Sequence, residues 1–245
     1  MEVKMNYVIK PIALCEGIRD MSQWTYRWNI GKKVKSACYI WYIQGSDPVT
    51  IVDAGAQGEH YNKEFPTTSI FSLEQGLQSV GLKAEEIEQV IVTHLHFDHI
   101  ALASKYKNAT FIVQKRELEY ACNPHVFNAV DYNREYFENL KFRIIDGDCE
   151  ILPDVKVFLT PGHSPGGQSI QIETWRGKAI ITGFCSQMST FTQTPSMKEK
   201  GLEVAACGLH TDCREVYDSA LKVKNMADII VPLHDPMFID IKSIP

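Results

Sequence analysis

Three histidines and one aspartate crowd into a single segment that reads THLHFDH from position 93. It directly follows the apolar run 89–92, which has the length and composition of a buried strand. If the chain stays extended from His94 to His96, the two imidazoles point to the same side, because side chains alternate along a strand. Asp98 and His99 then face a second position nearby. Imidazole suits zinc and iron, and a carboxylate adds a hard oxygen ligand, so the pattern predicts a metal site.

The remaining pattern supplies elements that could hold this segment in place. Turn residues separate short apolar runs, and three stretches show helical spacing. Strands are predicted at 37–44, 49–53, 89–93, 110–113, 142–145, 155–160, 168–173, 178–182 and 228–233, and helices at 72–80, 115–122 and 212–226. Asp212 could cap the last helix. Each half of the chain therefore carries strands and helices, which is compatible with two sheets face to face between helical layers. No linker interrupts the pattern, so we expect one domain over residues 1–245.

Composition narrows the class of partner. The chain has 245 residues, 44% of them hydrophobic, and a net charge of −5 without a basic run, which argues against a nucleic-acid partner. No stretch approaches the ~18 apolar residues of a membrane span, and the first residues do not resemble a signal peptide. Seven scattered cysteines are typical of reduced thiols. We expect a cytoplasmic protein that acts on a small molecule, without a membrane partner.

Four motifs together resemble one known family. The HxHxDH pattern after an apolar strand is similar to the signature of the metallo-β-lactamase superfamily. TPGHSPG from position 160 and VPLHD from position 231 resemble its later metal loops, and IVDAG from position 51 resembles its early aspartate motif. The residues of the segments 93–99 and 160–166 are most similar to those of the N-acyl-homoserine lactonases. The resemblance implies an α/β fold, an αββα four-layer sandwich, with the metal site at the edge between the two sheets.

The resemblance also implies a ligand set and a reaction. Two divalent metals are each held by three side chains, zinc being the first expectation and iron or manganese the alternatives. One group consists of His94, His96 and His163, and the other of Asp98, His99 and His234. Asp53 and Asp235 are expected to orient the imidazoles from behind. A metal-bound hydroxide would attack a carbonyl carbon while Asp98 carries the proton to the leaving group. The implied enzyme is a hydrolase that opens a lactone or a similar small ester.

One part of the family pattern is absent. The aspartate that usually bridges both metals has no counterpart: Phe184 stands at its place by counting, and Cys185 follows. A thiolate is a good zinc ligand, so Cys185 is a seventh candidate ligand. The alternative is a buried cysteine beside a phenylalanine plug, with a weaker or single-metal site. The tyrosine that such lactonases carry shortly afterwards is also absent here.

Aromatic and sulfur side chains are candidates for the wall of a substrate pocket. The predicted pocket residues are Met21, Trp24, Tyr26, Trp28, Phe184, Phe191 and His210. Such a wall would bind an apolar or planar organic group. The alternatives are that the rings pack on a sheet edge or form the interface of a homodimer.

Three other functions compete with a lactonase-like hydrolase. A thioesterase resembling glyoxalase II would need a cluster of basic residues to bind the tail of its substrate, and no such cluster is evident. An oxidoreductase resembling the mononuclear iron persulfide dioxygenases would fit the loss of the bridging carboxylate, but His99 and His234 argue against it. A metal-binding protein without catalysis is the third, and the six intact ligands weigh against that reading.

Overall fold

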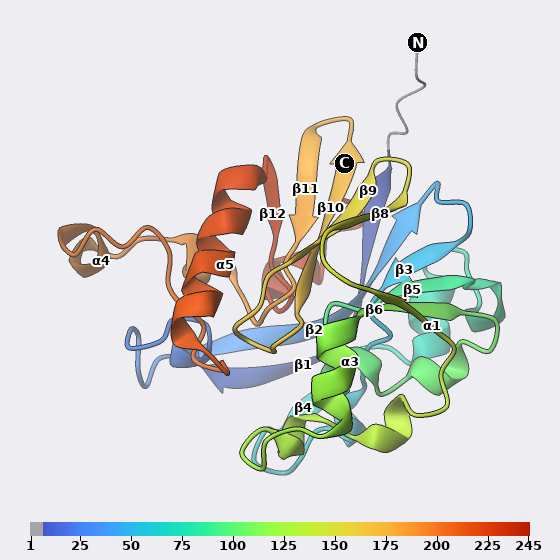
Figure 1. Cartoon of the computed structure of the whole chain (residues 1–245), viewed down its shortest axis with the longest axis horizontal. Helices are drawn as coiled ribbons and strands as arrows, with labels where there is room; N and C mark the ends of the chain where they lie inside the picture. Colours follow the sequence, from blue (N-terminus) through green and yellow to red (C-terminus); the bar gives the residue numbers. More distant parts are fainter. Residues whose placement is uncertain (1–6) are drawn as a thin grey trace.

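The computed structural model describes residues 7–245 and contains two β-sheets (Figure 1). The first has seven strands in the order β4-β1-β2-β3-β5-β6-β7. Its strands are β1 (Val8–Asp20), β2 (Lys33–Gln44), β3 (Thr50–Val52), β4 (Thr67–Ser69), β5 (Gln89–Ile91), β6 (Thr110–Gln114) and β7 (Phe142–Ile145). Strands β3, β5, β6 and β7 run parallel to one another, so their carboxyl ends meet at one edge of the sheet.

The second sheet has five strands in the order β12-β11-β10-β9-β8. They are β8 (Cys149–Leu152), β9 (Val155–Leu159), β10 (Gln168–Thr174), β11 (Gly177–Ile181) and β12 (Ile229–Val231). The α-helices are α1 (Leu73–Gln78), α2 (Phe97–Ile100), α3 (Lys115–Cys122), α4 (Pro195–Glu199) and α5 (Cys213–Met226). The carboxylate of Asp212 caps α5, as predicted, because it accepts the amide N–H groups of Arg214 and Glu215.

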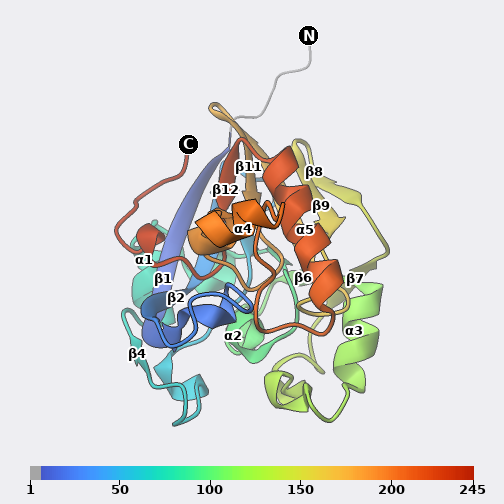
Figure 2. The same ribbon diagram turned by 90° about the vertical axis from the view of Figure 1, so that its left-hand side faces the viewer.

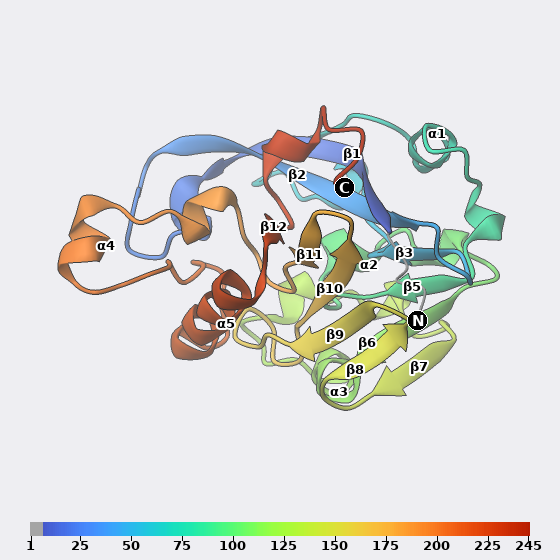
Figure 3. The same cartoon turned by 90° about the horizontal axis from the view of Figure 1, so that it is seen from above.

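Three apolar layers hold the sheets and helices together. Trp41 and Ile91 of the first sheet share a buried cluster with Val157 and Ile181 of the second, so the core lies between the sheets. A second cluster joins α1 to the outer face of the seven-stranded sheet, and a third joins α5 to the outer face of the five-stranded sheet. Figure 3 shows both sheets lying between α1 and α5. The predicted αββα sandwich is therefore confirmed.

The longest strand is one that the sequence pattern did not reveal. Strand β1 pairs with β2 from Val8 to Asp20, although Pro11 and Gly17 are residue types depleted in strands. Pro11 is tolerated because β4 pairs only with residues 15–17, so the outer side of β1 is unpaired at position 11. Strands β4 and β8 and the short helices α2 and α4 were also not predicted, and α1 is shorter than the expected 72–80.

The segment after β1 lies beside the segment that leads into α5 (Figure 2). The amide of Tyr26 donates to the carbonyl of Ala206 at 2.8 Å, and the amide of Gly208 donates to the carbonyl of Gln23 at 2.8 Å. These bonds fix the first residues after β1 against the second half of the chain, at the edge where the strand ends converge. Within residues 7–245, no helix combines the length and apolar character needed to cross a bilayer.

Candidate metal centre

Six side chains of types that bind metals meet at the edge between the two sheets. His94 and His96 follow β5, and Asp98 and His99 lie on α2. The fifth and sixth come from the second sheet, His163 from the loop between β9 and β10 and His234 from the loop after β12. The side chains form two groups, and the ligand atoms within each group lie within 4.8 Å of one another. The rings of His94 and His99 connect the groups, with centroids 4.2 Å apart.

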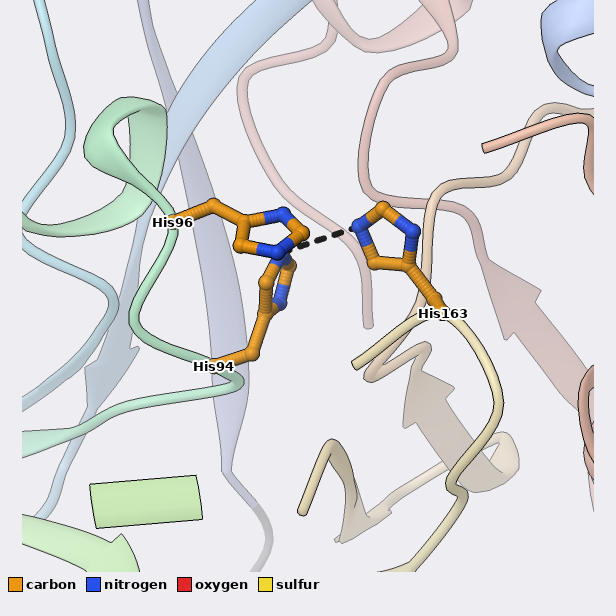
Figure 4. Close-up of side chains that lie close together, drawn as sticks. All are labelled: His94, His96 and His163. Carbon is orange, nitrogen blue, oxygen red and sulfur yellow. Dashed lines mark hydrogen bonds between the residues drawn. The ribbon is translucent and has the colours of Figure 1, made fainter. Parts of the chain in front are cut away.

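The first group consists of His94, His96 and His163 (Figure 4). Nδ1 of His163 donates to the carbonyl of Leu209 at 2.6 Å, which leaves a lone pair on Nε2. Nδ1 of His94 lies 3.1 Å from the hydroxyl of Thr93, whose own proton goes to Asp53, so Nε2 of His94 also carries a lone pair. The two Nε2 atoms are 3.1 Å apart.

Two facing lone pairs repel each other unless a cation lies between them. Tetrahedral zinc, with bonds of about 2.0–2.1 Å to nitrogen, places its ligands roughly 3.4 Å apart. The spacing of the Nε2 atoms of His94 and His163 is close to this value. The first group therefore fits a divalent metal by the chemistry of its donors.

The second group consists of Asp98, His99 and His234. Oδ2 of Asp98 lies 3.5 Å from Nε2 of His99 and 3.8 Å from Nε2 of His234. Nδ1 of His234 donates to the carbonyl of Ala37 at 3.0 Å, and Nδ1 of His99 donates to Asp53. Nε2 of His99 is buried without a hydrogen-bond partner in the described chain. An orphaned buried nitrogen facing a carboxylate is the second observation that fits a metal here.

Burial sets most of the protonation states that metal binding requires. Burial lowers the pKa of His94 and His96 well below the usual value, and it lowers that of His163 and His234 to about 4. Burial raises the pKa of Asp98, but the nearby histidines, His99 first, outweigh this and lower it. These four imidazoles are therefore neutral and the carboxylate ionised near pH 7, which are the ligating forms.

His99 differs because acidic groups surround it. Burial lowers its pKa, but Asp98 and Asp53 outweigh that effect and raise it to about 9. Asp53 has a positive φ of 61°, and its carboxylate also accepts the amide and the hydroxyl of Thr93, at 2.7 and 2.9 Å. Asp53 therefore stands behind one histidine of each group, where the sequence motif had suggested a bracing residue.

Glu117 supports both metal loops and was not singled out from the sequence. It is 1% exposed on α3 and accepts the amide of Leu95 at 2.9 Å and the amide of Gly166 at 3.0 Å. The hydroxyl of Tyr132 donates to the same carboxylate at 3.3 Å. One carboxylate thus ties the loop of His94 and His96 to the loop of His163. The available signal was its position four residues before Ala121, on the helix face that is buried.

A cavity of about 260 Å³ opens beside both groups. His96, Asp98, His163 and His234 line it. Of the predicted pocket residues, Trp24 and His210 also line it. The wall does not include Met21, Tyr26, Trp28, Phe184 or Phe191. Tyr26 lies behind the wall, with its ring edge-on to His210 at 4.8 Å, because its backbone is bound to Ala206.

Cys185, Phe184 and Asp235 do not make the contacts that the sequence led us to expect. Cys185 lines the cavity, but its thiol is not part of either ligand group, and burial raises its pKa well above the usual value. Phe184 is fully buried in the apolar cluster beneath α5. Asp235 does not contact an imidazole through its carboxylate, which accepts the amides of Met188 and Met237 at 2.7 and 2.9 Å.

Comparison with known proteins agrees with this fold. The model of the family described as the metallo-beta-lactamase superfamily matches residues 35–232. The chain belongs to that superfamily.

Curated relatives and a solved structure resemble the chain over different lengths. An N-acyl homoserine lactonase of Bacillus cereus is 38% identical over 110 residues, so the match covers 43% of this chain and 40% of the relative. An N-acyl homoserine lactonase of Bacillus thuringiensis is 37% identical over 195 residues, covering 74% of this chain and 75% of the relative. The crystal structure of a quorum-quenching N-acyl homoserine lactone hydrolase superposes with a TM-score of 0.75, at 24% identity, over 96% of this chain and 95% of that chain.

Proposed function

We propose that this protein is a metal-dependent hydrolase that opens lactones or related small esters. The observation that carries the proposal is the convergence of two candidate ligand groups on the wall of one cavity. In the first group the Nε2 atoms of His94 and His163 face each other at 3.1 Å. The relatives named as N-acyl homoserine lactonases support the same reaction class. In this reaction one water molecule is added across an ester bond, which gives a carboxylic acid and an alcohol.

The side chains divide this work between them. Bound divalent metals, zinc first, would supply an activated water and polarise the ester carbonyl. His94, His96 and His163 would hold one metal, and Asp98, His99 and His234 the other. Asp98 would also act as the proton carrier, because its side chain is ionised and 18% exposed at the cavity. Asp53 and Glu117 would keep the imidazoles and their loops in position.

Metal analysis combined with a hydrolysis assay tests this proposal. We expect about two zinc ions per wild-type chain and acid release from N-hexanoyl homoserine lactone, followed at constant pH by titration. His94→Ala should lose metal and lower kcat by at least about 100-fold, since the activated water depends on the metal. His125→Ala is the matched control, because His125 is an exposed histidine outside both groups. A metal-loaded wild type that releases no acid from any lactone or ester would contradict the proposal.

A further inference from the structure

Arg19 is a buried cation on the wall of the same cavity. Its side chain, near the end of β1, is 8% exposed and lines the cavity together with the metal-ligand residues. No carboxylate of residues 7–245 forms an ion pair with it. Glu16 lies on the same wall but binds Lys35, with Nζ and Oε2 3.0 Å apart. A buried guanidinium without a counter-charge is unfavourable, so this one indicates an anion that comes from outside the chain.

Three hydrogen bonds hold the guanidinium but leave part of it free. Nη1 of Arg19 donates to the carbonyls of Ile18 and Pro66 at 3.1 and 3.2 Å, and Nη2 donates to the hydroxyl of Thr67. A guanidinium has five N–H groups, so the one on Nε and the second one on Nη2 have no acceptor among the described residues. Nε and Nη2 are neighbouring nitrogens, and a carboxylate can bind such a pair with its two oxygens.

The surroundings restrict the guanidinium to this place. Its Cζ atom lies 5.5 Å from the ring centroid of Tyr61 and 5.6 Å from that of Phe65, and both rings line the cavity. A Cβ atom at Gly17 would come within 2.9 Å of the same Cζ, so glycine leaves the space that the guanidinium fills. The charge is thus fixed by its neighbours before any ligand arrives, which reduces the entropy lost on binding.

We propose that Arg19 binds a carboxylate that the substrate carries at the end remote from the hydrolysed bond. This inference rests on the proposed hydrolase function for the reacting end of the substrate and adds a requirement at the other end. Asp98 and His163 line the same cavity as Arg19, so one small molecule can reach both. The substrate class is therefore lactones or small esters that bear a free carboxylate, and Arg19 is a specificity-determining residue.

Compounds of equal chain length separate this inference from the reaction itself. N-adipoyl and N-hexanoyl homoserine lactone share a six-carbon acyl chain, which ends in a carboxylate in the first and in a methyl group in the second. Their ring-opened acids can be titrated by calorimetry into metal-loaded protein without any turnover. The succinoyl and glutaroyl analogues vary the distance between the two ends. Variants are Arg19→Gln, which removes the charge, and Arg27→Gln, an equal charge change on an exposed residue outside the cavity.

We expect wild type to bind at least one ring-opened compound with a carboxylate-ended acyl chain at least tenfold more tightly than ring-opened N-hexanoyl homoserine lactone. Arg19→Gln should abolish this preference, and with the lactones it should raise KM for the carboxylate-bearing compound and change kcat little. Arg27→Gln should keep the preference. Equal or undetectable binding of both compounds by wild type, or a preference that survives in Arg19→Gln, overturns the inference. If the binding preference holds but neither lactone is hydrolysed, the hydrolase proposal fails and the carboxylate site stands.

A purely structural role of Arg19 gives a different result. If the residue only ties β1 to the segment of Pro66 and Thr67, Arg19→Gln lowers the melting temperature and weakens both compounds equally. Should Arg19→Gln fail to fold, the comparison of the compounds in wild type still decides whether a carboxylate is preferred. Arg19→Lys then tests whether the paired N–H groups are needed, since lysine keeps the charge but lacks the neighbouring Nε and Nη2 donors.

Discussion

The carboxylate of Asp53 accepts a hydrogen bond from Nδ1 of His99 at 2.7 Å, and both side chains are buried at the edge between the two sheets. The same carboxylate accepts the hydroxyl of Thr93, which in turn faces Nδ1 of His94 at 3.1 Å. Asp53 therefore orients one histidine of each ligand group, and the ring nitrogens on the far side are left to face the metals. A single residue at the end of β3 couples the two candidate metal positions.

Replacing Asp53 by asparagine should weaken metal binding without disturbing the backbone. Asparagine tolerates the left-handed conformation that Asp53 adopts, at φ 61°, so the loop can keep its shape. The side-chain amide carries no charge and turns its NH2 group toward one of the donors that Asp53 accepts. Comparable changes behind metal-bound histidines lower metal affinity about 10- to 100-fold. Competition with a chromogenic chelator measures this. Asp146→Asn, at an exposed aspartate, is the control, and equal affinities of the two variants would contradict the role of Asp53.

Glu117→Gln should destabilise the fold and loosen both metal loops. A glutamine side chain offers one acceptor oxygen and one NH2 donor, whereas Leu95 and Gly166 both present amide donors to the carboxylate. One buried N–H group is then left without a partner, which destabilises a protein by about 1–3 kcal/mol. Urea unfolding of the zinc-loaded protein measures the loss. Glu119→Gln on the exposed face of α3 serves as the comparison, and an unfolding midpoint equal to that of this control would refute the expected role.

The sequence indicated which side chains gather into the two candidate ligand groups, because the signal for them is local. The ligands His94 to His99 stand in one short segment, and each of the other two follows a recognisable strand. The parts that were missed depend on residues far apart in the chain. Glu117 acts through amides 22 and 49 residues away, and no local pattern encodes those contacts. Arg19 depends on Pro66 and Thr67 in the same way.

The pocket was predicted less well for a similar reason. Aromatic residues near position 24 suggested a wall, but composition does not show which rings face inward. The backbone bond from Tyr26 to Ala206 directs the chain so that Trp24 lines the cavity and Tyr26 does not. Strand β1 was missed because Pro11 and Gly17 weaken its pattern, and that strand carries Arg19.

Cys185→Ala should leave the number of bound metals unchanged. The thiol lies in an apolar cluster with Trp24 and Phe191 and is not part of either ligand group, and burial raises its pKa, which disfavours the thiolate that a metal needs. Elemental analysis of wild type and variant, purified without added metal, gives the answer. A fall from two metals to one in the variant would show that the thiol is a ligand after all and takes the place of the missing bridging carboxylate.

Stability of the metal-free protein should be greatest near pH 6.5. His163 and His234 have pKa values of about 4 in the folded chain, below the value of about 6.5 expected when unfolded. As pH falls from 6.5 to 4, the unfolded chain gains protons that the folded chain does not, so each residue removes stability, on the order of 3 kcal/mol at pH 4. His99 acts in the opposite direction, because its folded pKa of about 9 gives stability that is fully present below pH 6.5 and lost as pH rises toward 9.

Urea midpoints of chelator-treated protein between pH 4 and pH 9 measure this profile. In His163→Gln the loss of stability toward acid pH should be smaller, since one histidine with a lowered pKa is removed. His125→Ala should follow wild type because His125 is exposed. A midpoint that rises on going from pH 6.5 to pH 4, or an acid side unchanged in His163→Gln, would mean that these imidazoles are not held neutral by burial. The neutral ligand set on which metal binding depends would then have to arise only when the metal arrives.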